Sequence, residues 1–247
     1  MVLDHSINTF KKNISLLMVF SLTFLFALLV PILAGTPTYN SMGGVYLRFL
    51  SIPETTAMDK IVIIVSFLIS NFLMSFGIVA VNLIVKKERV LINIKKEILD
   101  NIARTTTLLF GVFVVLFIVN AVIQILIVEY KIPQILGSLI YIALYLPFFY
   151  IGPAMVIDNF KPVQAFFTGL NHIKMYPMRV FNWTLLGMIL LLGTSVLTYV
   201  VLPNEFQWLT ILVNSFIIIP FLLIYQSHNY IEKYNILITD KRGRKDV

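Results

Sequence analysis

The stretch ISLLMVFSLTFLFALLVPILA, residues 14–34, is apolar almost throughout and contains no Asp, Glu, Lys or Arg. A helix rises about 1.5 Å per residue, so about twenty residues cross the roughly 30 Å hydrocarbon core of a bilayer. One charged side chain at the centre of such a helix would cost about 2.5–3.5 kcal/mol, whereas each Leu, Ile, Val or Phe contributes only a few tenths of a kcal/mol in favour of insertion. This stretch is therefore predicted to be a transmembrane helix.

Five further stretches are equally free of charged residues. They cover residues 61–85, 105–128, 135–157, 180–201 and 206–225. The composition agrees, because 59% hydrophobic and 13% charged residues exclude an ordinary water-soluble surface. The sequence therefore predicts an all-α, polytopic integral membrane protein with six transmembrane helices. We expect one membrane domain over residues 1–247 with a cytoplasmic tail at 231–247.

The basic residues divide unevenly between the segments that connect the predicted spans. With the amino terminus in the cytoplasm, sixteen of the 19 Lys and Arg residues fall on the cytoplasmic side, leaving Arg48, Lys60 and Lys131 outside. Cytoplasmic loops of membrane proteins carry such an excess. We expect a multi-pass protein of a prokaryotic plasma (cell) membrane with both termini in the cytoplasm. The net charge of +7 then orients the protein in the membrane and attracts anionic lipid headgroups, and it does not indicate nucleic-acid binding.

Three charged segments on the cytoplasmic side show the apolar spacing of amphipathic helices. Leu3, Ile7 and Phe10 are spaced in this way, and segments 86–104 and 158–179 have similar patterns. Short, charged helices of this kind lie in the membrane interface. Because the connections outside are brief, we expect three hairpins, each preceded by an interfacial amphipathic helix. Such helices either dock a partner, such as a cytoplasmic ATPase, or merely lead the chain from one hairpin to the next.

These segments also suggest an internal repeat. Two of them end in the same Asn-x-x-Lys pattern before a span, at Asn8/Lys11 and Asn171/Lys174, and the third has Arg at the last position. A triplicated chain would have units at 1–85, 86–158 and 159–230. Amphipathic helices also resemble one another by chance, so both interpretations remain open.

Polar and helix-breaking residues inside the spans are the candidate functional positions. Asn and Gln side chains in a membrane either hydrogen-bond between helices or line a polar path. Pro interrupts helical hydrogen bonding, and broken helices present backbone groups to substrate in transporters. The candidate positions are Asn71, Asn120, Gln124, Pro147, Gly152, Pro153, Asn214 and Pro220.

The fourth span carries the strongest of these signals. Pro147 and Pro153 are close enough to break it, and the unpaired backbone groups between them cannot face lipid. We expect this break to face protein or a water-filled cavity. The expected polar neighbours are Asn120 and Gln124 of the third span and Asn71 of the second.

The sequence offers little for catalysis or cofactor binding. It has no Cys, and its three His residues, His5, His172 and His228, lie outside the predicted spans without metal-ligand spacing. Common hydrolase and zinc-protease motifs are missing. The charge-free spans offer no titratable group for acid–base chemistry. We therefore expect no catalytic residue, metal site or cofactor.

Two parts of the sequence carry a family resemblance. The first runs GPAMVID (152–158), PVQAF (162–166) and GLN (169–171), and the second is INTFKKN (7–13). They resemble uncharacterised archaeal and bacterial six-span membrane proteins, a group similar to the membrane domain joined to some glycerophosphodiester phosphodiesterases. The resemblance implies a six-span helical fold and no settled activity, since the phosphodiesterase catalytic domain has no counterpart here.

These observations favour a non-catalytic role in the membrane. We expect a permease-like subunit or a component of membrane homeostasis. One alternative is a solute or lipid transporter that works with a partner ATPase, and another is an interfacial lipid-modifying enzyme. The expected partners are the lipid bilayer and either a cytoplasmic ATPase or another membrane subunit.

Overall fold

A computed structural model describes residues 2–41, 44–48, 55–89, 94–203 and 205–232. Six helical segments in this part of the chain are long and apolar enough to cross a membrane: Ile14–Leu33, Ala57–Glu88, Ile102–Ile127, Leu139–Ile157, Pro177–Val201 and Phe206–Ile231. The prediction of an all-α chain with six membrane-spanning helices is thereby confirmed. The sixth segment extends six residues beyond its predicted end, since no charged residue interrupts the sequence before Glu232.

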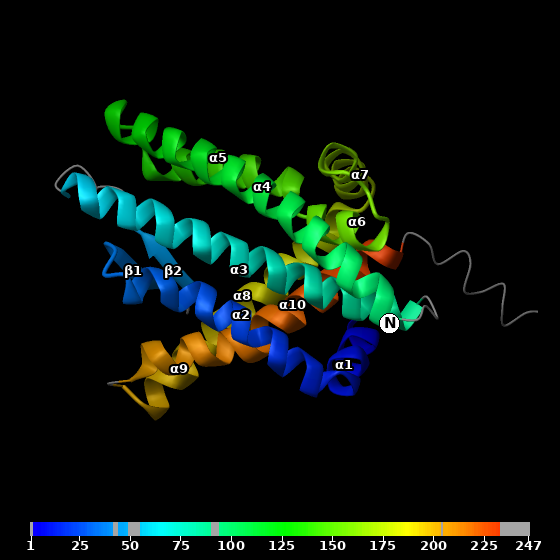
Figure 1. Cartoon of the computed structure of the whole chain (residues 1–247). Helices are drawn as coiled ribbons and strands as arrows, with labels where there is room; N and C mark the ends of the chain where they lie inside the picture. The colour runs from blue at the N-terminus through cyan, green and yellow to red at the C-terminus, as the bar shows by residue number, and fades with distance from the viewer. Residues whose placement is uncertain (1, 42–43, 49–54, 90–93, 204, 233–247) are drawn as a thin grey trace, which may run out of the picture.

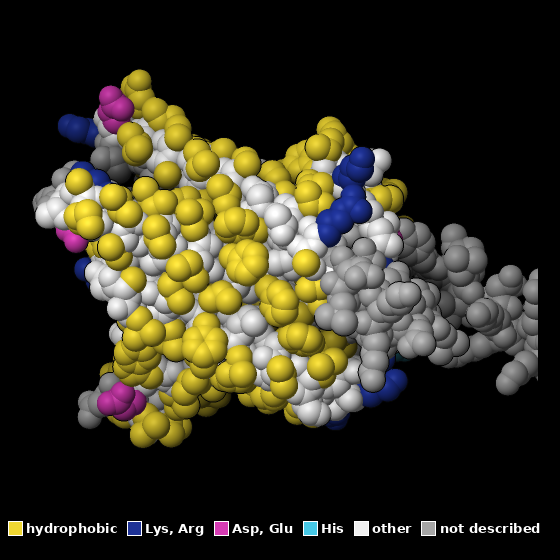
Figure 2. All heavy atoms as spheres, viewed as in Figure 1, with side chains coloured by type: hydrophobic (Ala, Val, Ile, Leu, Met, Phe, Trp, Pro, Cys, Tyr) yellow, Lys and Arg dark blue, Asp and Glu magenta, His cyan; other side chains and the backbone are white. Residues whose placement is uncertain are grey.

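Four of the spans are single helices. They are α2 (Ile14–Leu33), α3 (Ala57–Arg89), α4 (Ile94–Glu129) and α8 (Pro177–Val201). Helix α3 lies between α2 and α4 in the bundle (Figure 1). Apolar side chains cover the middle of the face seen in Figure 2, and the charged side chains gather at its two ends. This distribution is the one that a bilayer requires of a protein that spans it.

The other two spans change helix type next to prolines. The fourth consists of α5 (Gln134–Tyr145), a 3₁₀ turn η2 (Leu146–Phe148) and α6 (Ile151–Ile157). The sixth consists of α9 (Phe206–Val213), a π-helical turn η3 (Asn214–Ile218) and α10 (Ile219–Ile231). Pro147 lies in η2 and Pro220 is the second residue of α10, and neither can donate a backbone hydrogen bond. The predicted break of the fourth span is confirmed.

Two short helices lie at the end of the molecule that carries the amino terminus, here called the α1 end. Helix α1 (Val2–Lys12) is separated from α2 by Asn13, and α7 (Pro162–Met175) is separated from α8 by Tyr176. In Figure 1, α7 is seen almost along its axis, whereas the long helices cross the picture. Helix α7 therefore runs across the direction of the spans.

The segment 86–104 differs from the expected separate amphipathic helix. Helix α3 continues to Arg89, and residues 94–104 form the first turns of α4. No Pro or Gly occurs between residues 94 and 104, so helical hydrogen bonding that begins at Ile94 continues into the span. The prediction of an independent helix here is therefore wrong for the residues that the structure describes. The tail from residue 233 onward lies outside them.

The opposite end, here called the hairpin end, carries a small β-hairpin. Strand β1 (Thr38–Ser41) pairs in antiparallel fashion with β2 (Gly44–Leu47), and Tyr39 lies opposite Tyr46. Their rings stack at 5.4 Å, an ordinary cross-strand aromatic pair. The all-α prediction therefore holds for the spans but missed this hairpin.

The apolar core lies towards the α1 end, where α2, α3, α6 and α10 meet. A Cβ atom at Gly77 of α3 would lie 2.6 Å from both Phe24 and Thr23 of α2, so these two helices approach closely. Fully or almost fully buried core side chains come from every helix in this region: Leu17, Phe24, Val81, Val85, Leu109, Tyr150, Ala154, Ile224 and Tyr230.

Candidate functional site at the α1 end

The last turns of α10 carry five consecutive buried residues with hydrogen-bonding side chains. They are Gln226, Ser227, His228, Asn229 and Tyr230, and none is more than 8% exposed. Five consecutive residues point in all directions around a helix, because one turn takes 3.6 residues. Each buried polar group left unpaired costs about 1–3 kcal/mol. Neighbouring elements supply partners for the side chains of this segment except Asn229, whose Nδ2 has none among the described residues. We call residues 226–230 and their partners the polar layer.

Gln226 connects α10 to the break of the fourth span. Its Nε2 donates to the backbone oxygen of Phe149 over 2.6 Å. Phe149 follows η2, where the 3₁₀ turn interrupts regular helical hydrogen bonding. The Gln226 side chain of the sixth span thus satisfies a backbone group at the break of the fourth span.

Ser227 connects α10 to α3. Its hydroxyl lies 2.7 Å from Asn82 Oδ1, and both residues are fully buried. The Asn82 amide nitrogen donates to the backbone oxygen of Ile78 at 2.8 Å, so Oδ1 is the atom that can accept from Ser227. The Ser227 hydroxyl proton is also within reach of the Leu223 backbone oxygen, 2.8 Å away in its own helix. This bond fixes the rotation of α10 relative to α3.

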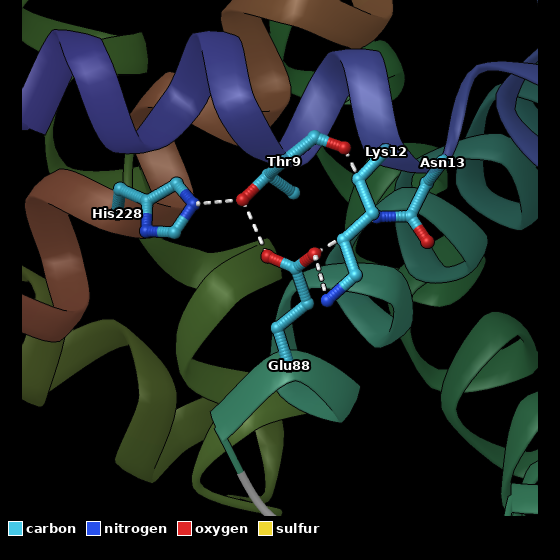
Figure 3. Close-up of polar contacts among 5 residues, drawn as sticks. All are labelled: Thr9, Lys12, Asn13, Glu88 and His228. Carbon is cyan, nitrogen blue, oxygen red and sulfur yellow. Dashed lines mark hydrogen bonds and ion pairs between the residues drawn. The ribbon is translucent and has the colours of Figure 1, made fainter.

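His228 is joined through Thr9 to Glu88, as Figure 3 shows. Thr9 Oγ1 lies 2.5 Å from Glu88 Oε2 and 3.0 Å from His228 Nε2. An ionised carboxylate only accepts, so the single hydroxyl proton of Thr9 goes to Glu88. The Thr9 oxygen then accepts from His228, which requires a proton on Nε2. The three side chains form a directed chain from α10 through α1 to α3.

Glu88 also binds two further donors from the amino-terminal part of the chain. Asn13 Nδ2 donates to Glu88 Oε1 over 3.0 Å, and Lys12 Nζ lies 3.8 Å from the same oxygen. The Glu88 side chain is 19% exposed, whereas that of Lys12 is 75% exposed. Water therefore reaches the Lys12 side of this carboxylate, while its Thr9 side is enclosed.

The remaining residues of the polar layer connect α10 to α6 and α8. The Tyr230 hydroxyl donates to Asp158 Oδ2 over 2.6 Å, just after the end of α6. Arg179 donates to the backbone oxygen of Asn229 at 3.1 Å and pairs with Glu232 at 3.0 Å. The last turns of α10 are thus hydrogen-bonded to three other helices, to the turn after η2 and to the residue that follows α6.

His172 of α7 lies beside this layer and is 1% exposed. Its ring is 4.8 Å from that of Tyr150 and 5.5 Å from that of Tyr230, centre to centre. The sequence places His172 on a charged segment outside the spans, where a solvated side chain is expected. The structure instead buries it, because α7 turns the face with Ala165 and Gly169 towards the bundle.

Some of the candidate positions from the sequence lie at this end. Gly152 and Pro153 are buried in α6, and a Cβ atom at Gly152 would lie 3.0 Å from Ile78 and 3.6 Å from Asn82. Pro147 lies in η2 just before the break. The backbone there is bonded by Gln226, although Asn71, Asn120 and Gln124 are the neighbours expected from the sequence.

The other candidate positions lie elsewhere in the spans. Asn214 is 1% exposed and begins the π-helical turn, and Pro220 follows that turn. Asn71, Asn120 and Gln124 are partly exposed, and Gln124 lies beside the Tyr141 hydroxyl. These residues are not gathered into one site with the polar layer.

Only the α10 part of the polar layer has a signal in the sequence. Residues 226–231 carry no formal charge except what His228 can take up, so the sixth span could be extended through them. A polar but uncharged stretch at the end of a span is typical of the segment that follows a span, so the predicted sixth span ends at residue 225. The spacing of Thr9 and Glu88 gives no hint that they meet His228.

Three or more His, Cys, Asp or Glu residues do not gather into a possible metal site anywhere in the described parts of the chain. The chain matches no family model, no curated protein and no solved structure. The fold and this site define it as a helical, multi-pass membrane protein with a buried polar layer at one end. The resemblance to the phosphodiesterase-linked membrane domain rests on the residues quoted for it and remains an expectation.

Proposed function

We propose that this protein is a non-catalytic, permease-like subunit of the cell membrane, with its α1 end in the cytoplasm. The hydrogen bond from Gln226 to the Phe149 backbone oxygen, 2.6 Å long, carries this proposal. It joins the sixth span to the break of the fourth at the level of a buried polar layer. Discontinuous transmembrane helices form the substrate sites of many transporters, which supports this proposal.

The titratable groups of the layer argue for a structural use of its polarity. Asp158 accepts from Tyr230, and Glu88 and His228 are both bonded to Thr9. Each of these groups holds a side chain of another helix, which favours interhelical attachment over catalysis. An interfacial lipid-modifying enzyme is therefore the weaker alternative.

The proposed cytoplasmic orientation gives α1 and α7 a place in the membrane interface. Helix α1 turns Ser6 and Thr9 towards the bundle, leaves Leu3 42% exposed on its apolar face, and exposes Lys11 and Lys12. An apolar face beside a charged one suits a helix lying at the headgroups. The crosswise direction of α7 supports the same placement (Figure 1).

The proposed arrangement in three hairpins is supported by one contact in each. Gly77 of α3 packs directly against Phe24 of α2. A Cβ atom at Gly137 of α5 would lie 3.4 Å from Ile127 of α4. Thr198 Oγ1 of α8 lies 2.5 Å from Thr210 Oγ1 of α9, a hydroxyl pair of the kind that joins transmembrane helices.

The exposed face of α7 supports a cytoplasmic ATPase as the partner of this subunit. It directly follows the interrupted fourth span, so movement there would pass to it. Its outward face exposes Val163 by 67% and Phe167 by 58% between the basic residues Lys161 and Lys174. Apolar anchors on a helix at the cytoplasmic face suit docking into a groove of a partner.

The test is purification of the full chain in mild detergent, followed by mass spectrometry of bound proteins and lipids. We expect a cytoplasmic ATPase or another membrane subunit to co-purify, and Phe167→Asp to remove it. The control is Asn171→Asp, which adds the same charge to the exposed face of α7 but keeps the aromatic anchor. Absence of a stoichiometric protein partner, together with no solute flux in proteoliposomes, would contradict the permease-like role.

A further inference from the structure

Helix α1 is bound to the bundle through an unusual face. Its buried residues are Ser6 and Thr9, which are 0% and 3% exposed, although Leu3 and Ile7 are available for burial. Leu3 remains 42% exposed. Burial of apolar surface normally holds a helix in place, and α1 uses little of it. Apart from Phe10, the buried face of α1 is therefore polar, and the Ser6 hydroxyl bonds within the helix to the Val2 backbone oxygen.

The polar contacts of α1 meet at one carboxylate. Thr9, Lys12 and Asn13 all direct a donor towards Glu88, the first and last by hydrogen bonds of 2.5 and 3.0 Å. These donors lie within five consecutive residues at the carboxyl end of α1 and its junction with α2. Figure 3 shows them converging on Glu88. Loss of this one negative charge would leave three donors without their acceptor.

The apolar attachment of α1 lies at the same end of the helix. Phe10 packs against the core, and its ring meets that of Phe221 edge-on at 6.1 Å. Asn13 then interrupts the helix, with φ −111° and ψ 19°. The part of α1 from Val2 to Ser6 extends away from this fixed point. Rotation of α1 about Asn13 therefore carries Phe10 away from Phe221 together with the rest of the helix.

We infer that α1 is a hinged lid, held closed through Glu88, whose opening brings water to His228 and the polar layer of α10. The hinge is Asn13, and Ser6 lies on the moving side. Hydrogen bonds exchange for bonds to water at little net cost, so the packing of Phe10 against Phe221 is the apolar contact that opening has to give up. The lid acts independently of whether the protein works as a permease subunit.

The absence of Cys from the sequence allows a direct test. Ser6→Cys places a single thiol on the enclosed side of α1, and Ser75→Cys places one at an equally buried position of α3, since both serines are 0% exposed. The full chain is treated in detergent with a water-soluble maleimide, and labelling is followed by mass spectrometry. We expect the thiol at position 6 to react at least tenfold faster than the thiol at position 75.

Glu88→Gln then tests the anchor. We expect it to raise the labelling rate at position 6 about tenfold, because hydrogen bonds to a charged acceptor are stronger than those to a neutral one. The rate at position 75 should not change. Lys87→Gln is the matched control, since it alters a charge one residue away on an exposed side chain.

Three outcomes would overturn the lid. Equal protection of the two thiols in the otherwise unchanged protein would mean that α1 does not open. An unchanged rate at position 6 after Glu88→Gln would mean that Glu88 does not hold it. An equal rise at both positions would mean that the substitution loosens the whole bundle. Thr9→Val, compared with Thr9→Ser, repeats the test without changing charge, and faster labelling at position 6 only for Val is required.

Discussion

Ser227 of α10 and Asn82 of α3 lie 145 residues apart in the sequence and 2.7 Å apart in the fold. Both are enclosed completely, and the Asn82 amide is already used within its own helix. The contact is therefore a buried hydrogen bond that joins two spans. Side-chain hydrogen bonds of this type contribute about 0.6–2 kcal/mol each inside membranes.

Removal of this hydrogen bond should lower the free energy of unfolding of the protein. Ser227→Ala leaves Asn82 Oδ1 without its donor, and we expect a loss of about 1–2 kcal/mol, measured by unfolding in detergent. Ser195→Ala is the control, because the Ser195 hydroxyl bonds to the Leu191 backbone oxygen of its own helix. An equal effect of the two substitutions would show that the hydrogen bond between α10 and α3 contributes no more to stability than a bond within one helix.

The close approach of α2 and α3 predicts a difference between two glycines. Gly77→Ala would place a methyl group 2.6 Å from Phe24, so we expect a destabilisation of about 1–3 kcal/mol from overpacking. Gly111→Ala in α4 meets nothing within 4 Å and should cause no loss. Thermal unfolding of both variants in the same detergent provides the measurement. Tolerance of Ala at position 77 would contradict the close helix crossing.

The interrupted fourth span should depend on the sixth. Gln226→Leu removes the donor to the Phe149 backbone oxygen, and an unpaired buried acceptor costs about 1–3 kcal/mol. We expect lower stability and faster proteolysis near the break, detected by mass spectrometry of the fragments. Gln207→Leu, an exposed site at the start of α9, should have neither effect.

The proposed orientation can be measured with single thiols. Cysteines at Ser41 and Thr56, both exposed at the hairpin end, should react with an impermeant reagent added outside intact cells. A cysteine at Gln164, exposed on α7, should react only after the cells are opened. The reverse pattern would place the α1 end outside and would remove the basis for a cytoplasmic partner.

The spans could be predicted from the sequence because their signal is local. Whether residues 14–34 cross a bilayer depends on those residues alone, and no charged group interrupts them. The break at Pro147 is equally local, since proline removes a hydrogen bond wherever the helix lies. Expectations of this kind agree with the structure.

The polar layer could not be predicted because its partners come together only in the folded chain. Thr9 and His228 are 219 residues apart, and Gln226 and Phe149 are 77 apart. No spacing rule connects such positions. The same limit explains the misplaced neighbours of the break, where Asn120 and Gln124 were expected on the basis of polarity alone. Their helix, α4, lies with its middle largely exposed.

The contacts of α10 also have a consequence for the synthesis of the chain. This helix emerges last of the six spans, yet Thr9, Asn82, Phe149 and Asp158 all bond to it. Earlier spans therefore enter the membrane with part of their hydrogen bonding unfinished. A nascent chain that stops before α10 leaves these groups without the partners that α10 supplies. Insertion of α10 is therefore the step that completes the hydrogen bonds of the polar layer.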